Sequence, residues 1–240
     1  MEVQIAVAKV NKYAVSESGD TLEVVERPNG GMSVVLSDGQ TSGRGAKTIS
    51  TMVVRKVISL LAEGVRDGAA ARAASDYLYT ERSGKVSASL NIISADFQTG
   101  TLVITRNNPS PMFIAQGEDI ECLSSECRPI GTSRNIRPAI CEMQLAVGST
   151  IVVFTDGLIH AGDRYGQSLD ICTILKGLLE EQNPTSQEIA NSLLAEAIRI
   201  DQDRPNDDMS VVVVRVLEGQ DDQIRQMTVR LPVPRSAPFL

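Results

Sequence analysis

Residues 32–48 read MSVVLSDGQTSGRGAKT, and this stretch decides how the rest of the chain is interpreted. An apolar run ends in Ser37-Asp38-Gly39, and a loop of small residues then leads into a long helical pattern. A carboxylate at the end of a buried strand, followed by a glycine whose carbonyl can approach the same ion, is suited to holding a divalent cation. Asp-Gly is also a common turn dipeptide, so both interpretations of Asp38 are open at this point.

The segment before this stretch places a second carboxylate nearby. Residues 21–27 are predicted to be a strand, residues 28–31 a tight turn, and residues 32–37 the antiparallel return strand. A hairpin brings the start of one strand beside the end of the other. We therefore expect Asp20 and Asp38 to lie side by side.

Helical and strand patterns follow one another in blocks. Apolar residues recur at helical spacing over 46–63 and 67–82, which predicts two consecutive helices lying over a sheet. Near the C-terminus, Thr185 and Glu188 have the spacing of a capping box at the start of a helix. The remaining predicted strands cover 3–10, 86–95, 101–106, 112–115, 120–123, 139–145, 150–155 and 211–216, and the remaining helices cover 169–181 and 187–200.

The layout of Asp38 recurs later in the chain. Strand 150–155, which is expected to form a hairpin with strand 139–145, ends in Thr155-Asp156-Gly157. A further acidic pair, Asp207-Asp208, stands at the start of the apolar strand 211–216. Because carboxylates recur at the ends of buried strands, simple turns explain them less well than a shared site at one end of a sheet.

The composition limits the classes of function. The 240 residues are 42% hydrophobic and carry a formal net charge of −7, which argues against a nucleic-acid or anionic-membrane surface. No apolar run is long enough to span a bilayer, and the N-terminus lacks the pattern of a signal peptide. The four cysteines form no C-x-x-C pair and there is one histidine, so a zinc site is not expected. A cytoplasmic protein with reduced thiols is the expectation.

Oxygen ligands at strand ends suit Mg²⁺ or Mn²⁺ rather than zinc. Two such ions about 4 Å apart can share a carboxylate and a hydroxide, and so provide a nucleophile for attack on phosphorus. Several gathered carboxylates should strain the metal-free site, and metal binding should relieve that strain.

Taken together, these motifs resemble those of the PP2C-like metal-dependent serine/threonine phosphatases, in the bacterial branch of the sporulation stage II and stress-response phosphatases. The resemblance covers about residues 1–217, in the family's order and spacing. The matching pieces are Ser18-Gly19-Asp20, Ser37-Asp38-Gly39, Gly43-Arg44-Gly45-Ala46, Pro129-Ile130-Gly131, Phe154-Thr155-Asp156-Gly157-Leu158 and Asp207-Asp208-Met209-Ser210.

The resemblance implies an α+β fold, a four-layer α-β-β-α sandwich in which a central antiparallel β-sandwich is flanked by helices, with metals at one end. It implies that Asp38 bridges two divalent ions, Mn²⁺ or Mg²⁺, one of which also binds the Gly39 carbonyl. Asp156 and Asp207 would hold the other ion, and Asp20 would join the second metal directly or through water. Asp38, Asp156 and Asp207 are thus the expected catalytic residues.

Several finer expectations follow from the resemblance. The family pattern favours Asp207 over Asp208 as the ligand. The segment 107–111, NNPSP, departs from the family's Asn-Ala-Gly-His type stretch and is expected to change surface contacts and not the chemistry. We expect the phosphatase domain to cover 1–217, with an extension over 218–240 that adds a strand at 225–231 and ends in a Pro-rich segment. The helix over 46–63 is the expected regulatory element, because residues 43–46 tie it to Asp38.

The implied activity is hydrolysis of phosphoserine or phosphothreonine on a bacterial regulatory protein by metal-activated water. The sequence shows no fused sensor, kinase or receiver domain, so it looks most like a stand-alone feedback phosphatase of the stressosome system. The implied substrates are small STAS-type domains or anti-anti-sigma factors, with no nucleic-acid or membrane partner.

Other interpretations are open. Residues 39–48 suggest a phosphate-binding P-loop, but Ala46 separates Gly45 from Lys47, which breaks the required spacing. A catalytically silent PP2C-like domain that binds phosphorylated partners is a second alternative, against which stands the presence of every acidic position. His160 is a candidate proton donor and Arg44 a candidate phosphate contact, although a structural or exposed role explains either residue as simply.

Overall fold

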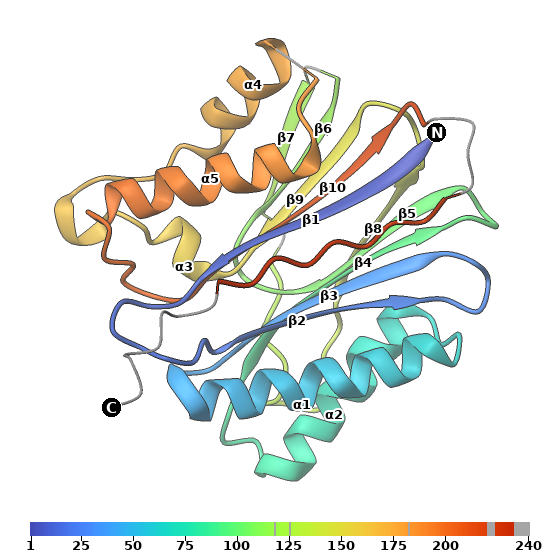
Figure 1. Cartoon of the computed structure of the whole chain (residues 1–240). Coiled ribbons are helices and arrows are strands. Elements are labelled where there is room, and N and C mark those ends of the chain that lie inside the picture. Colours follow the sequence, from blue (N-terminus) through green and yellow to red (C-terminus); the bar gives the residue numbers. More distant parts are fainter. Residues whose placement is uncertain (118, 125, 182, 220–223, 233–240) are drawn as a thin grey trace, which may run out of the picture.

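The computed structural model describes residues 1–117, 119–124, 126–181, 183–219 and 224–232. Two antiparallel five-stranded sheets face each other, and helices cover both outer faces, as predicted (Figure 1). The first sheet runs in the order β1 (Glu2–Val10), β10 (Met209–Leu217), β9 (Ser149–Phe154), β6 (Met112–Gln116) and β7 (Asp119–Leu123). The second runs in the order β2 (Asp20–Glu26), β3 (Met32–Gly39), β4 (Ala88–Asp96), β5 (Thr101–Asn107) and β8 (Ala139–Gln144).

The helices divide between the two outer faces (Figure 1). Helices α1 (Gly43–Ala62) and α2 (Asp67–Arg82) pack on the second sheet. Helices α4 (Ile171–Glu181) and α5 (Ser186–Ile200) pack on the first, and the short helix α3 (Asp156–Ile159) directly follows β9. The capping box of Thr185 and Glu188 at the start of α5 is present.

Both faces of the central strands are buried, which explains why their sequences are largely apolar instead of alternating. In β10, Val212 and Val214 point into the layer between the sheets, while Val211 and Val213 point to the helices. Residues of β9 alternate in the same way. The molecule therefore has three apolar layers: one between the sheets and one beneath each pair of helices.

The predicted hairpin between 139–145 and 150–155 is wrong. Strand β8 pairs with β5 at the edge of the second sheet, whereas β9 lies inside the first sheet between β10 and β6. The linking segment crosses between sheets, and its ends are held by the bonds Leu145 N to Gly100 O and Gly148 N to Val216 O, of 2.8 and 2.9 Å. The burial patterns give the reason, because β8 alternates between covered and exposed positions, as an edge strand does, and β9 is buried throughout.

The predicted strand at 225–231 is also not formed. Residues 224–232 adopt no helix or strand, and Ile224, Met227, Val229 and Leu231 are each at least 69% exposed. The rest of the predicted Pro-rich end, 233–240, lies outside the described residues. Within the part of the chain that the structure describes, no helix has the length and apolar character needed to cross a membrane.

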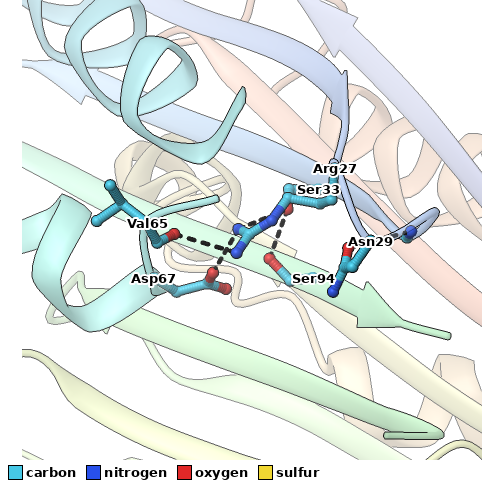
Figure 2. A network of polar contacts seen from close by, with 7 residues as sticks. Arg27, Asn29, Ser33, Val65, Asp67 and Ser94 are labelled. Carbon is cyan, nitrogen blue, oxygen red and sulfur yellow. Dashed lines mark hydrogen bonds and ion pairs between the residues drawn. The ribbon is translucent and has the colours of Figure 1, made fainter. Parts of the chain in front are cut away.

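A polar network fixes the helical layer to the second sheet at one end (Figure 2). The guanidinium of Arg27, just after β2, donates to Asp67 Oδ1 at 2.8 Å and to the Val65 carbonyl at 3.1 Å. Beside it, the hydroxyls of Ser33 and Ser94 on neighbouring strands lie 2.6 Å apart. This network holds the junction between α1 and α2, at the end of β2 opposite to Asp20.

Candidate metal centre

Two pairs of neighbouring strands, one from each sheet, bring four carboxylates to one end of the sandwich. In the second sheet Asp20 and Asp38 are direct register partners, as the predicted hairpin required. In the first sheet Asp156 follows β9 and Asp207 precedes β10, and these two strands are antiparallel neighbours. Asp38, Asp156 and Asp207 line one cavity of about 450 Å³.

Asp20 connects the two sheets. Its carboxylate is fully buried, and Oδ2 accepts hydrogen bonds from Thr155 Oγ1 at 3.0 Å, directly after β9, and from Ser210 Oγ at 2.5 Å, in β10. The backbone carbonyl of Asp20 accepts from the ammonium groups of Lys9 and Lys47, at 2.7 and 2.8 Å. The other carboxylate oxygen, Oδ1, has no hydrogen-bond partner although it is buried. A buried oxygen left without a partner is suited to a cation.

The glycines after Asp38 and Asp156 are required by close packing. A Cβ on Gly39 would collide with the carbonyl oxygen of Ala46 in α1, and one on Gly157 would collide with the carbonyl oxygen of Asp208. A Cβ on Gly19 would lie 2.8 Å from the Ala46 side chain. The repeated Asp-Gly pattern thus reflects two places where backbones meet beside the site, one of them between β3 and α1.

Asp207 and Asp208 have different environments. Asp207 lines the cavity, whereas Asp208 is 5% exposed and is directed at the backbone of the 11–19 loop. Its Oδ1 accepts from Lys12 N at 2.9 Å and its Oδ2 from Gly19 N at 2.7 Å. Asp207 is therefore the member of the pair that faces the cavity, whereas Asp208 holds the 11–19 loop.

The carboxylates repel one another across the site. Burial, and after it the charges of Asp20 and Asp156, raises the pKa of Asp38 to about 9. Burial also raises the pKa of Asp207. It raises the pKa of Asp20 as well, against the opposing effects of the Ser210 hydrogen bond and the Lys9 charge. A site that resists negative charge in this way is one that a bound cation would stabilise.

The donor set fits a hard divalent cation. It consists of carboxylate and carbonyl oxygens, with the unpartnered Asp20 Oδ1 among them. Among the residues that the structure describes, no three Asp, Glu, His or Cys side chains are gathered closely enough to hold one ion together. Asp38, Asp156 and Asp207 are less tightly enclosed than Asp20.

The expected surface role of segment 107–111 is wrong, because much of it is buried beside the site, whereas the expectation that its departure leaves the chemistry unchanged stays a prediction. Asn107 and Asn108 are 0% and 2% exposed, and the Asn108 amide donates to the Phe154 carbonyl at 2.9 Å. Asn108 and Pro109 also line the cavity. The polar pair Asn107-Asn108 at the end of the buried strand β5 is the sequence signal that could have pointed to this buried position.

The other residues considered as functional candidates have different surroundings. Arg44 is exposed and lies 3.8 Å from Glu17, and His160 is exposed with Nδ1 at 3.0 Å from Asp163 Oδ2. Lys47, the residue on which the P-loop interpretation depends, is directed at the Asp20 carbonyl and the Thr21 hydroxyl. Sequence reasoning missed Lys12, which lines the cavity with the carboxylates.

Comparisons with known proteins identify structures that share the fold of this chain. A structure of the PP2C phosphatase domain and a fragment of the regulatory domain of SpoIIE from Bacillus subtilis matches with a TM-score of 0.78 and 24% identity, over 90% of this chain and 64% of that one. A structure of RsbX in complex with magnesium matches with a TM-score of 0.69 and 16% identity, over 89% of this chain and 95% of that one. The fold of this chain is thus that of the PP2C-like phosphatase domains.

The family can be stated more closely. Residues 28–217 match the family model of stage II sporulation protein E, SpoIIE, and the chain belongs to this family. Stage II sporulation protein E of Bacillus subtilis is 25% identical over 201 residues, and that of Priestia megaterium 23% over 215 residues. These alignments include 83% and 89% of this chain, but the chain spans only 24% and 36% of the two relatives.

Proposed function

We propose that this protein is a metal-dependent phosphatase that hydrolyses phosphoserine or phosphothreonine on a bacterial regulatory protein. The observation that carries the proposal is that Asp38, Asp156 and Asp207, from both sheets, line one cavity, with the buried Asp20 paired directly with Asp38. Membership of the SpoIIE family and the PP2C-like fold support it.

Asp38, the Gly39 carbonyl, Asp156 and Asp207 would hold the divalent ions, Mn²⁺ or Mg²⁺, with Asp20 completing the set. When bound, such ions supply the Lewis-acid charge that activates water and polarises the phosphoryl group. The residues of the chain position this chemistry: Thr155 and Ser210 orient Asp20, and Asp208 fixes the loop that carries Lys12.

Lys12 is suited to binding the substrate phosphate. It is the only lysine or arginine among the described residues that line the cavity, and its positive charge acts on Asp207. A phosphate monoester dianion entering a site lined by carboxylates needs a cation to bind it, in addition to the metals. Lys12 supplies that charge at a position fixed through its own backbone nitrogen.

The test is hydrolysis of p-nitrophenyl phosphate and of a phosphoserine-bearing STAS domain, with Mn²⁺, with Mg²⁺ and with EDTA. We expect metal-dependent release of phosphate that is lost in Asp38→Asn and in Asp156→Asn. Asp96→Asn is the matched control, because Asp96 lies at the far end of β4 and accepts only from the local Gln98 and Thr99 nitrogens.

The outcomes separate the alternatives. Hydrolysis that persists unchanged in both site variants would overturn the assignment of the ligands. Tight binding of the phosphorylated domain with no hydrolysis under any metal would instead identify a silent binding domain. Cleavage of the small phosphate ester but not of the STAS domain would support the proposed hydrolysis and overturn the proposed substrate class.

A further inference from the structure

Helix α1 carries only positive charges. The charged side chains among its 20 residues are Arg44, Lys47, Arg55 and Lys56. The chain as a whole has a formal net charge of −7, so this concentration of positive charge is local. On the opposite outer face, α4 and α5 pair their bases within the helix, through Lys176 and Glu180 at 3.6 Å and Arg199 and Glu196 at 2.5 Å. Helix α1 lacks such internal pairs, which leaves its charge available to a partner.

Three of the four bases of α1 line one groove. The groove has a volume of about 650 Å³ and is bounded by α1 and by Tyr77 of α2. Lys47, Arg55 and Lys56 supply its charges, and no carboxylate lines it among the residues that the structure describes. Its lining residues on α1 extend from Lys47 to Ser59, which corresponds to about 18 Å along the helix axis.

The three cations of the groove have no acidic partner. None of the ion pairs formed by the described residues includes Lys47, Arg55 or Lys56. Lys47 donates to a backbone carbonyl, that of Asp20, and the Lys56 ammonium lies 5.7 Å from the centre of the Tyr77 ring. Arg55 is exposed, and Tyr77 is 38% exposed. The groove therefore presents uncompensated positive charge and an accessible aromatic ring.

The spacing of the cations indicates what kind of anion fits the groove. Lys47 and Arg55 are separated by about 12 Å along the helix axis, and both side chains incline toward the N-terminus of α1, so they do not converge on one point. A single phosphate group is too small to engage both. An extended peptide, at about 3.3 Å per residue, covers the groove with about five or six residues. A nucleic acid would bring its phosphates against a chain that is acidic overall, which favours an acidic peptide as the occupant.

We propose that this groove docks an acidic, extended segment of the phosphoprotein that the chain dephosphorylates. The proposal rests on the proposed phosphatase function and adds a docking surface outside the metal cavity. The groove begins beside that cavity, because Lys47 reaches the Asp20 carbonyl and the adjoining Ala46 packs against Gly39, which lines the cavity. From there it follows α1 toward Ser59. A substrate whose phosphorylated residue occupies the cavity thus meets positive charge along α1 for its acidic segment.

The first test measures docking and needs no activity. The probe is a fluorescein-labelled peptide of alternating Glu and Ala, about ten residues long so that it exceeds the groove. Its binding to the full chain in EDTA is followed by fluorescence anisotropy. We expect the affinity to fall by about tenfold or more in the double variant Arg55→Glu/Lys56→Glu, because two attractive charges become repulsive, and to fall as salt is added.

The matched control for this test is Lys176→Glu/Arg199→Glu, which changes the net charge by the same amount on the opposite helical layer. It should bind the peptide nearly as well as the unaltered chain. Equal losses in the two double variants, or no binding by the unaltered chain, would overturn the groove as a docking site. Tighter binding of a short DNA duplex than of the Glu-Ala peptide would overturn the acidic peptide as its occupant.

The second test compares two substrates of the metal-dependent reaction. In Arg55→Glu/Lys56→Glu we expect the KM for a phosphoserine-bearing STAS domain to rise by about tenfold or more. The KM and kcat for p-nitrophenyl phosphate should stay unchanged, because neither side chain lines the metal cavity. Equal losses with both substrates, or an unchanged KM for the STAS domain, would overturn the docking role.

Failure of the phosphatase function would be recognised separately. If the unaltered chain hydrolyses no p-nitrophenyl phosphate with Mn²⁺ or Mg²⁺, the proposed function is overturned, and the peptide-binding test still decides whether the groove binds acidic segments.

Discussion

At the scale of single residues, Asp38 makes the metal-free protein sensitive to pH. Its pKa in the folded chain is raised to about 9, whereas an unfolded aspartate titrates near pH ~3.9. The folded state therefore binds this proton more tightly, and the stability that results is complete below about pH 4 and is lost as the pH rises through about 9. We predict that in EDTA the free energy of unfolding falls between about pH 5 and about pH 8.5, by at least about 1 kcal/mol.

The same measurement on Asp38→Asn isolates the contribution of Asp38 to the pH dependence of the free energy of unfolding. The amide carries no charge at any of these pH values, so we expect a shallower slope and a variant that is more stable than the unaltered chain at the alkaline end. Some slope should remain, because burial raises the pKa of Asp20 and Asp207 as well. Asp96→Asn should keep the full slope. Equal slopes in all three proteins would contradict the assignment of the repulsion to Asp38.

Lys12 gives a second prediction at this scale. Replacing it by Met removes the charge and keeps the backbone nitrogen that holds Asp208. Loss of one charge-assisted contact to phosphate should raise the KM for p-nitrophenyl phosphate by about tenfold and change kcat less. The affinity for Mn²⁺ should not weaken, since a positive charge is removed. Lys176→Met on α4, where the ammonium pairs with Glu180, is the control. An unchanged KM would show that Lys12 does not bind the phosphate.

At the scale of elements, α1 is fixed at both ends, and one of those ends is the metal centre. The Arg27 network holds the junction with α2 (Figure 2), and at the other end Ala46 packs against Gly39 and Gly19. Movement of α1 along the sheet therefore changes the packing around Asp38. This is the physical basis for the expectation that α1 regulates the site.

Gly39→Ala tests this junction. The added methyl group collides with the α1 backbone, so we predict a loss of stability of about 1–3 kcal/mol together with weaker Mn²⁺ binding. Gly45→Ala, on α1 itself, meets no atom within 4 Å and should leave metal binding unchanged while stabilising the helix by about 0.5–1 kcal/mol. Both properties would be read from thermal unfolding and Mn²⁺ titration. Equal Mn²⁺ affinity in the two variants would show that the packing of α1 does not affect the metal site.

The elements also show how far the sequence could be interpreted. The pairing of Asp20 with Asp38 was predictable because the turn between their strands is only a few residues long and its sequence signals a reversal. The pairing of β8 was not, because alternation identifies a strand but does not name its partner. Lys12 and Asn108 reach the site through contacts with Asp208 and Phe154, which are 196 and 46 residues away in the sequence. No local pattern encodes such contacts.

At the scale of the whole molecule, the three apolar layers of the described residues include no residue beyond β10, which ends at Leu217. Residues 224–232 have strongly exposed apolar side chains and one ion pair, between Arg225 and Glu26 at 3.6 Å. We predict that a chain of residues 1–217 folds with a midpoint of thermal unfolding close to that of the full chain and keeps the proposed phosphatase activity. A loss of more than about 1 kcal/mol would show that the extension is part of the domain.

The proposed ligands come from both sheets, so metal binding should stabilise the sandwich as a unit. Asp20 and Asp38 belong to β2 and β3, and Asp156 and Asp207 adjoin β9 and β10, so an ion held among them opposes separation of the sheets. Mn²⁺ at about a hundred times its dissociation constant should add about 2.7 kcal/mol to the free energy of unfolding. For a chain of this size, that gain raises the midpoint of thermal unfolding by roughly 5–10 °C.

Asp38→Asn removes a proposed ligand from one sheet and Asp156→Asn from the other, and each should abolish most of the gain, whereas Asp96→Asn should retain it. If only one site variant lost the gain, the ion would be held by a single sheet, and the metal centre would have to be redrawn on that sheet alone.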